Sequence, residues 1–513
     1  MPDKKNYVRR SQRHKQTLNT YKKSDQLHAT VSKERTKAKM TKRNLAYRKY
    51  IFSLLIALTL IIIATGGYII YTLKQQEAKA HAKYEVATKE LIASIQKEQE
   101  QNGISVKIDT VSDGKNKCLI YSPSNENNIP FKNVNQTLKK LAQKQHSKHN
   151  KKEVLTIAKI KITTISSKAE NYQIEAISFV WDRNKEHFHK SDSISEKSIY
   201  VSKKTGKEIT TRDLIPDEEG LLGIQQVIQQ TILNNTKEPE KIIDAVLTMD
   251  RISYDNKMTY TPTELAINLK KNKTGTTKVT LKYKDIAPFI NTELVSSESI
   301  KDAFPTLNKN KKYVALTFDD GPNNSSTLDL LNILKKENVK ATFFMLGQMV
   351  EQNPHVARQV HEEGHEIASH SYSHPQLNTL PKDSLQNEIN KTNKAIFKAT
   401  GVLPQNIRPP YGAIDKSSAE TIGMPIVQWA IDSQDWKLRN SDATIKNILN
   451  QPIYNGAIIL LHDIHRESVI AVSRLITILK NKGYEFVTIN QLLSGKQKPL
   501  YQYFGMNDKR IVD

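Results

Sequence analysis

The sequence predicts an α/β protein in which a C-terminal domain of βα units follows a membrane-spanning helix and an α+β module. Three observations predict this class. From Lys311 to about Leu493, short apolar runs alternate with amphipathic stretches, which is typical of a parallel sheet or barrel. A long uncharged apolar stretch lies near the N-terminus. The region between the two contains short segments rich in β-branched and aromatic residues.

Length, charge and cysteine content narrow the class further. The chain has 513 residues, more than one hydrophobic core usually holds, so we expect several domains. A net charge of +24 indicates polyanionic surroundings, which are nucleic acid, acidic lipid or an anionic cell wall. Cys118 is the only cysteine, which excludes an intramolecular disulfide and a small disulfide-stapled scaffold. We interpret Cys118 as a structural residue.

Residues 51–73 are predicted to form a transmembrane helix. These 23 residues include no charged side chain and are dominated by Ile, Leu and Ala, and about 20 helical residues cross a hydrocarbon core of about 30 Å. A cleavable signal peptide would have a shorter apolar region and a small-residue cleavage site. The alternative is a helix buried in a soluble core.

Residues 1–50 are predicted to form a basic cytoplasmic tail. They hold sixteen Lys and Arg against three acidic residues, and positively charged flanks stay in the cytoplasm. The chain after residue 73 would then lie outside the cell. Contact with anionic lipid of the inner leaflet explains the charge of the tail. A nucleic-acid partner is not expected, because the tail lacks regularly spaced aromatic residues.

Two regions lie between the span and the C-terminal domain. Residues 74–101 have no Pro or Gly, and their apolar residues recur at roughly helical spacing, so we predict a helical stalk. Residues 102–300 contain β-like segments such as 154–164 and 172–181, with a helical stretch at 221–233. They hold no cluster of candidate catalytic groups. We predict one or two α+β accessory modules that act either as a spacer or in glycan binding.

Five polar clusters stand out in the predicted C-terminal domain, residues 311–493, which a tail of residues 494–513 follows. Four of them come directly after a plausible apolar strand, and the third has only a weak strand before it. In βα barrels the carboxyl ends of the strands form the functional face, where distant residues converge. The clusters are Asp319-Asp320-Gly321-Pro322, His370-Ser371-Tyr372-Ser373-His374-Pro375, Arg408-Pro409-Pro410-Tyr411-Gly412, Asp432-Ser433-Gln434-Asp435-Trp436 and His462-Asp463.

Each cluster alone has an ordinary explanation. Paired aspartates before Gly-Pro are typical of a turn, and two histidines four residues apart can be exposed loop residues. A single Arg or His is more often a surface residue or a satisfied buried one. Their joint occurrence at strand ends instead predicts one pocket. Because successive strand residues face opposite sides, Asp319 and Asp320 can serve one site only where the strand breaks, and Gly321-Pro322 supplies a break.

The residue types in this pocket predict metal-assisted hydrolysis. Two histidines and one carboxylate form a facial triad that leaves metal positions open, which suits zinc, iron, cobalt or nickel. The residues alone do not show which aspartate would join His370 and His374. Such an ion polarises an amide carbonyl and lowers the pKa of water from 15.7 toward about 7. The second carboxylate can then take a proton from water, and a histidine can protonate the departing amine.

Together the five clusters resemble the motif set of the polysaccharide deacetylase family (carbohydrate esterase family 4, the NodB homology domain) over about 180 residues. The resemblance implies a distorted (β/α) barrel that binds one divalent ion, zinc in the first place, with cobalt, nickel, iron or manganese as alternatives. It implies that Asp319 is the catalytic base and that Arg408 orients it. The metal ligands would be Asp320, His370 and His374.

The same resemblance gives roles to five further residues. The backbone N–H of Tyr411 would complete an oxyanion hole. His462 would be the general acid, and Asp435 would tune its basicity. Trp436 would line the substrate groove, and Leu460 would form part of the pocket for the acetyl methyl group.

The order of basic tail, single span, stalk, accessory module and C-terminal domain is similar to that of Gram-positive peptidoglycan N-acetylglucosamine deacetylases. This similarity implies a single-pass protein of the cell membrane whose extracellular domain releases acetate from N-acetylglucosamine in peptidoglycan glycan strands. Pro322 after Asp-Asp-Gly also resembles the N-acetylglucosamine-directed members of the family. Alternative substrates are N-acetylmuramic acid, chitin-like oligomers and exported poly-N-acetylglucosamine. Other readings are a wall-binding protein with an inactive domain and a cytosolic nucleic-acid-binding protein.

Overall fold

The computed structural model describes residues 6–101, 106–113, 116–124, 131–149, 153–195 and 198–513. The chain divides into two compact units. The first comprises residues 1–96 and 179–190, and the second comprises residues 97–178 and 191–513. Each unit is described by itself.

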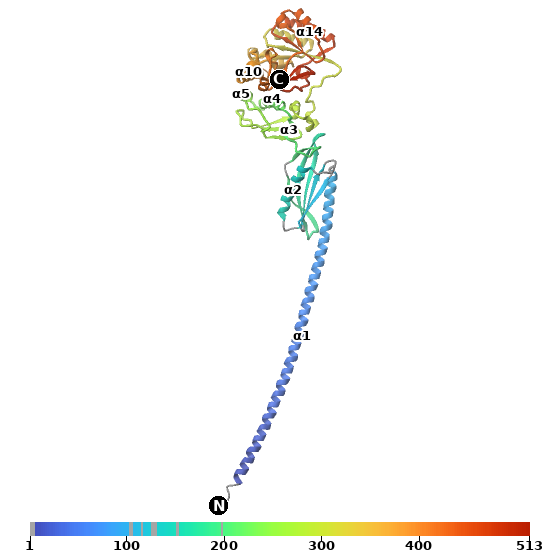
Figure 1. Ribbon diagram of the computed structural model, residues 1–513, viewed down its shortest axis with the longest axis vertical. Coiled ribbons are helices and arrows are strands. Elements are labelled where there is room, and N and C mark those ends of the chain that lie inside the picture. Colours follow the sequence, from blue (N-terminus) through green and yellow to red (C-terminus); the bar gives the residue numbers. More distant parts are fainter. Residues whose placement is uncertain (1–5, 102–105, 114–115, 125–130, 150–152, 196–197) are drawn as a thin grey trace. The chain divides into compact units, whose positions relative to one another are not determined.

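The first unit is dominated by α1 (Asn6–Gln101), one unbroken helix that contains the predicted span and the stalk (Figure 1). Within α1, the segment 43–101 is long and apolar enough to cross a membrane, and its most apolar window is not buried. This exposure is compatible with a single membrane anchor. Nearer the end of α1, Tyr84 packs edge-on against Trp181 and tilted against Phe188, with ring centroids 5.7 Å and 5.6 Å away.

Most of a six-stranded sheet of order β1-β2-β3-β4-β5, in which β6 pairs with β4, belongs to the second unit. The strand predicted at residues 154–164 is confirmed as β3. The apolar side of α2 (Lys132–His146) packs on this sheet, where Cys118 is also buried. Burial raises the pKa of the Cys118 thiol to about 11, in keeping with a structural role. The strands are β1 (Val106–Asp113), β2 (Asn116–Pro123), β3 (Val154–Thr164), β4 (Ala169–Asp182), β5 (His187–Ser195) and β6 (Ile199–Ser202).

A second, smaller layer of this unit is an antiparallel sheet of β7 (Met258–Tyr260), β8 (Glu264–Asn268) and β9 (Lys278–Lys282). Its apolar side packs on helices in a core that also includes Ala169 and Phe397. The helix predicted at residues 221–233 is confirmed as the central part of α4. The helices of this part are α3 (Thr211–Leu214), α4 (Glu218–Asn234), α5 (Pro239–Leu247) and α6 (Tyr283–Ile286).

The remainder of the second unit is a nine-stranded, mostly parallel sheet of order β12-β11-β10-β15-β17-β13. Three further strands extend this path, with β14 paired to β15, β16 to β10 and β18 to β17. The strands are β10 (Lys312–Asp319), β11 (Thr342–Met345), β12 (Glu366–Ser369), β13 (Ile426–Val427), β14 (Ile431–Asp432), β15 (Ala457–His462), β16 (Tyr484–Phe486), β17 (Tyr501–Gly505) and β18 (Asp508–Ile511).

Two isolated bridges curl this sheet into a barrel-like ring. Ile407 pairs in parallel with Ser369 at the end of β12 and with Ile426 at the start of β13. The weak strand predicted before the third cluster is therefore a single residue that joins the two edges. Helices follow the strands, as the alternating pattern predicts. They are α7 (Ser326–Glu337), α8 (Gly347–Gln352), α9 (Pro354–Glu362), α10 (Lys382–Thr400), α11 (Lys416–Ile422), α12 (Asp435–Leu438), α13 (Ser441–Asn450), α14 (Arg466–Asn481) and α15 (Ile489–Leu492).

The alternation of side chains along β10 determines which residues face the inside of the ring. Val314, Leu316 and Phe318 belong to the outer core beneath the helices, whereas Tyr313 and Ala315 belong to the inner core. Continuing the two-residue period places Thr317 and Asp319 on the inner side. The same holds for β15, where Ile458 is in the inner core and Leu460 and His462 continue that side.

The segment expected to form a C-terminal tail, residues 494–513, instead contributes β17 and β18 to the sheet. β17 pairs in parallel with β13 and touches β15 through the pair Ala457 and Gly505. Tyr503 is buried in the inner core. The aromatic residues of this short segment are too few to form an apolar run, so the pairing depends on the partner strands rather than on local pattern.

Candidate active site

The two aspartates of the first cluster reach the same space because β10 ends between them. Asp319 is the last residue of β10, and Asp320 has a left-handed φ of 75°. That backbone conformation turns the chain out of the strand, so the two side chains need not point to opposite sides. Nε2 of His370 lies 3.8 Å from Oδ2 of Asp319 and 3.5 Å from Oδ1 of Asp320.

The side chain of Asp463 packs directly against this turn. A Cβ atom on Gly321 would lie 2.3 Å from Oδ2 of Asp463, so only glycine fits between the turn and the carboxylate. The hydroxyl of Thr327 on α7 donates a hydrogen bond to the same carboxylate. Burial raises the pKa of Asp463 to about 7. The sequence reasoning gave Asp463 no role, although a carboxylate directly after β15 was a usable signal.

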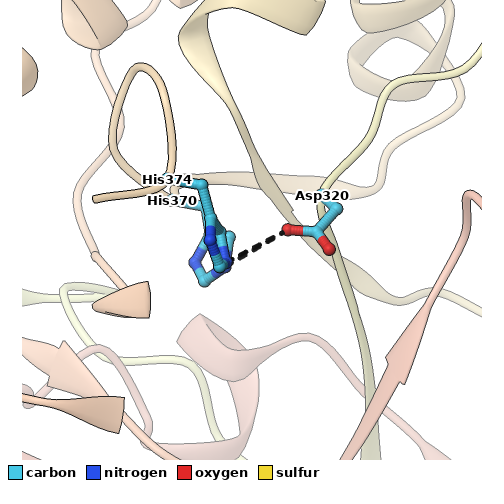
Figure 2. Close-up of side chains that lie close together, drawn as sticks. All are labelled: Asp320, His370 and His374. Atoms are coloured by element: carbon cyan, nitrogen blue, oxygen red, sulfur yellow. Dashed lines mark ion pairs between the residues drawn. The ribbon is translucent and has the colours of Figure 1, made fainter. Parts of the chain in front are cut away.

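Asp320, His370 and His374 form a cluster with the geometry of a metal site (Figure 2). One ligand atom from each residue lies within 4.8 Å of the other two. Both imidazole rings face the Asp320 carboxylate in Figure 2, and Nε2 of His374 is 3.6 Å from Oδ1 of Asp320. These three side chains come from the loops after β10 and β12, which pair with β11 between them.

A neighbouring carbonyl group fixes His370 with Nε2 free. Nδ1 of His370 donates to the carbonyl oxygen of Arg408 over 2.6 Å, which leaves Nε2 as a lone-pair donor. Burial lowers the pKa of His370 to about 3, so its ring is neutral. Glu388 on α10 accepts hydrogen bonds from the backbone N–H groups of Tyr372 and Ser373 and so holds the loop. Glu388 was not found by sequence reasoning, because nothing local links it to the loop.

The three residues fit a divalent ion. Oδ1 of Asp320 is buried and has no hydrogen-bond donor among the residues that the structure describes. A buried carboxylate oxygen without a donor is costly, and coordination to a cation would satisfy it. Two imidazole nitrogens and one carboxylate oxygen are also the donor set of open divalent-metal sites.

Arg408 lies inside the ring beneath Asp319. The guanidinium is fully buried, and Nη1 donates to Oδ1 of Asp319 over 2.7 Å and to the hydroxyl of Thr317 over 2.9 Å. Its remaining donors reach the carbonyl oxygens of Val427 and Gln428. Burial raises the pKa of Asp319, and the charge and hydrogen bond of Arg408 act against this rise. Arg408 thus holds Oδ1 of Asp319 in place, and Oδ2 faces the histidines.

His462, at the end of the neighbouring strand β15, forms a second buried pair with Asp435 of α12. Nδ1 of His462 donates to Oδ1 of Asp435 over 2.8 Å, and the hydroxyl of Ser468 on α14 donates to Oδ2. Burial alone lowers the pKa of His462, but the hydrogen bond and charge of Asp435, with Asp319 and Asp320, raise it to about 9. Nε2 of His462 then carries a proton 4.0 Å from Oδ2 of Asp320.

The structure thus brings the predicted metal and acid–base residues together. Arg408 contacts Asp319, and Asp435 contacts His462. The five residues are Asp319, Asp320, His370, His374 and His462. The other predicted residues surround this group. Tyr411 is 69% exposed with a left-handed φ of 61°, and its hydroxyl lies 3.3 Å from Nδ1 of His374. Trp436 is 51% exposed and follows Asp435 directly. Leu460 is buried on β15, on the same side of the strand as His462.

Comparison with known proteins gives two family matches. The sequence model described as polysaccharide deacetylase matches residues 306–427, and the one described as the peptidoglycan GlcNAc deacetylase N-terminal domain matches residues 88–302. The first match contains both aspartates, both histidines, Arg408 and Tyr411.

Curated relatives match part of the chain. A peptidoglycan-N-acetylglucosamine deacetylase PgdA of Listeria monocytogenes is 46% identical over 235 residues, which is 46% of this chain and 50% of the relative. A peptidoglycan-N-acetylmuramic acid deacetylase PdaC of Bacillus subtilis is 39% identical, over 38% of this chain and 41% of the relative. A peptidoglycan-N-acetylglucosamine deacetylase of Bacillus cereus is 42% identical, over 35% of this chain and 68% of the relative. The chain thus spans about half the length of the Listeria relative that it matches.

Proposed function

From the premise that the chain belongs to the polysaccharide deacetylase family, we propose that it hydrolyses the acetamide of N-acetylglucosamine in peptidoglycan and releases acetate. The single observation that carries this proposal is the convergence of Asp319, the metal-type triad and His462 at one edge of the ring. The names of the Listeria and Bacillus cereus relatives support N-acetylglucosamine as the substrate.

Asp320, His370 and His374 would hold one divalent ion, and we propose zinc, with cobalt, nickel, iron and manganese as the alternatives for metal analysis. When bound, the ion supplies Lewis-acid chemistry that polarises the acetamide carbonyl and makes nearby water more acidic. Oδ1 of Asp320, which has no hydrogen-bond donor in the described part of the chain, supports this assignment. The neutral ring of His370, held through Nδ1 by the Arg408 carbonyl, supports it as well.

Asp319 acts as the general base. Oδ2 accepts the proton of the attacking water, while Arg408 holds Oδ1 at 2.7 Å and fixes the orientation of the carboxylate. A carboxylate whose pKa is raised by burial is a stronger base than an exposed one. The buried arginine keeps its charge and so keeps Asp319 ionised until it takes the proton.

His462 acts as the general acid on the departing amine. Its pKa of about 9 keeps Nε2 protonated at neutral pH, and Asp435 holds the ring through Nδ1 so that Nε2 faces the site. The base and the acid end the neighbouring strands β10 and β15, so both can act on one bound acetamide. After the proton has been transferred, the Asp435 carboxylate again favours protonation of the ring.

Three residues would bind the substrate. The backbone N–H of Tyr411 would donate to the developing oxyanion, and its left-handed conformation sets this amide apart from a regular turn. Exposed Trp436 would pack against the sugar, since aromatic rings present a large apolar surface. Buried Leu460, beside His462 on β15, would contact the acetyl methyl group.

The long apolar helix supports a place in the cell membrane. We propose that residues 51–73 cross the bilayer, with the basic tail of residues 1–50 in the cytoplasm beside anionic lipid. Residues 74–101 would form the stalk, and 102–300 and 311–493 the accessory and catalytic parts outside the cell. Protease accessibility on intact cells tests this orientation, because only residues after the span should be cleaved.

Product mapping tests the substrate. The full chain, purified in detergent, is incubated with muropeptides, and mass spectrometry locates the missing acetyl group on the glucosamine or the muramic fragment. Loss from glucosamine is expected. The similarity to the PdaC relative favours muramic acid as the second candidate, and acetyl loss confined to muramic acid would overturn the first choice.

A further inference from the structure

Besides Arg408, a second arginine, Arg439, lies near the general acid His462. No acidic partner of Arg439 is found among the described residues. Arg439 comes directly after α12 and has a left-handed φ of 47°. Its side chain is exposed, and within the described ranges no carboxylate lies at ion-pair distance from it. An exposed arginine is ordinary by itself, so a role for Arg439 is inferred from the contacts that it makes.

Two hydrogen bonds hold the guanidinium of Arg439 in place. Nε donates to the carbonyl oxygen of Trp436 over 2.8 Å, and Nη1 meets Nδ1 of His465 at 2.6 Å. A free arginine side chain samples many rotamers, so fixing it in advance lowers the entropy cost of later binding. Nη2 makes no hydrogen bond to the described residues, so its N–H groups remain for an external acceptor.

The same contact determines the tautomer of His465. A guanidinium can only donate, so Nδ1 of His465 accepts the hydrogen bond and the ring proton lies on Nε2. The His465 ring lies 5.9 Å from the ring of His462. A second N–H donor is therefore provided next to the general acid, on the loop between β15 and α14.

This donor pair is not needed by the acetamide, which carries no charge. Resting on the proposed function, we propose that Arg439 and His465 form a subsite that binds a carboxylate of the glycan strand beside the sugar being deacetylated. In peptidoglycan this carboxylate belongs either to the lactyl group of the neighbouring muramic acid or to its stem peptide. The planar fork of arginine matches a carboxylate with two parallel hydrogen bonds.

A purely structural role makes a different prediction. If Arg439 only ends α12 through the Trp436 carbonyl, its loss would disturb Trp436 for every substrate alike. The informative quantity is therefore a ratio of kcat/KM values. The numerator is measured on a carboxylate-bearing peptidoglycan fragment and the denominator on a neutral N-acetylglucosamine tetramer, both with the full chain in detergent.

Arg439→Gln is expected to lower this ratio about tenfold, the size of one charge-assisted hydrogen bond at an accessible site. Lys437→Gln is the matched control, because Lys437 is exposed in α12, two residues before Arg439, and carries the same charge. It should leave the ratio within about twofold, as expected for a screened surface charge. An equal loss on both substrates in Arg439→Gln, or an equal change of ratio in Lys437→Gln, would overturn the subsite.

Two forms of the fragment identify the carboxylate. In one form an amidase has removed the stem peptide and left the lactyl carboxylate, and in the other the peptide remains. Sensitivity to Arg439→Gln with the stripped form supports the lactyl group, and sensitivity only with the peptide supports the stem. If the wild-type chain releases acetate from no substrate, the proposed function itself fails, whereas an unchanged ratio in an active enzyme overturns the subsite alone.

Discussion

Two sheets of the second unit, β7-β8-β9 and the ring that contains β10, differ in the direction of their strands. The residues that follow the strands therefore lie in different places. Neighbouring strands of β7-β8-β9 run antiparallel, so successive strands end at opposite edges. Strands β10, β11, β12 and β15 run parallel, so the residues after them meet at one edge. Asp319 and His462 are direct neighbours in this register, although 143 positions separate them. The parallel arrangement thus collects the acid–base groups that an antiparallel sheet would scatter.

Exposed and buried ion pairs of the second unit also differ in the free energy that each contributes. Lys168 and Glu293 form an ion pair in which both side chains are more than half exposed. Such a pair contributes about 0–1 kcal/mol. Arg408 and Asp319 are almost completely buried, and removing one partner of a buried pair costs about 3–5 kcal/mol. Polar residues in the ring therefore hold each other in place, which a catalytic geometry requires.

The largest difference between the regions should appear when a strand-end carboxylate is replaced. Asp319→Asn should reduce turnover about 1,000-fold, because general-base catalysis is lost, while the metal content stays unchanged. Steady-state kinetics and metal analysis of the full chain check this. Glu264→Gln at the start of β8 should retain wild-type turnover. Unchanged activity in Asp319→Asn would mean that another group is the base.

Replacing a histidine should distinguish the regions by metal affinity. His374→Ala removes one of three proposed ligands and should weaken metal binding at least about 100-fold, since even supporting partners contribute 10–100-fold. Competition with a chelator measures this. The exposed His187 of β5 is the control, and His187→Ala should bind metal as the wild type does. Stoichiometric metal in His374→Ala would contradict the triad.

A smaller effect is expected in the pH profile. His462 must be protonated to act as the acid, so activity is lost as the pH rises through its pKa of about 9. Asp435→Asn removes the charge that raises this pKa, so the alkaline limb should move to lower pH. Ser468→Ala keeps the charge of Asp435 and should move the limb less. An alkaline limb at the same pH in Asp435→Asn would exclude His462 as the titrating acid.

The smallest effect concerns stability in the region without catalytic groups. Thr210 caps α3, where its hydroxyl accepts from the N–H of Asp213 and the Asp213 carboxylate accepts from the N–H of Thr210. Thr210→Ala should lower the free energy of unfolding by about 1 kcal/mol and leave turnover unchanged. Thermal unfolding and kinetics of the full chain measure the two quantities. A loss of turnover at unchanged stability would show that this region takes part in catalysis.

Local pattern predicted the strand at Val154–Thr164 and the strand ends that carry the polar clusters, because alternation and apolar runs are written in adjacent residues. It could not predict that Ile407 closes the ring or that residues 501–511 join the sheet, since these pairings depend on distant strands. The residues alone also left open which aspartate joins the histidines. The left-handed backbone at Asp320 is a property of the folded turn.

The proposal that Asp320, His370 and His374 hold one catalytic ion is tested most directly by titration. Metal is removed from the full chain, and acetate release from peptidoglycan fragments is followed while zinc is added. We expect negligible release without metal and a linear rise that ends at one ion per chain. Full acetate release from the metal-free chain, or a rise that ends at two ions, would contradict a single catalytic ion at this triad.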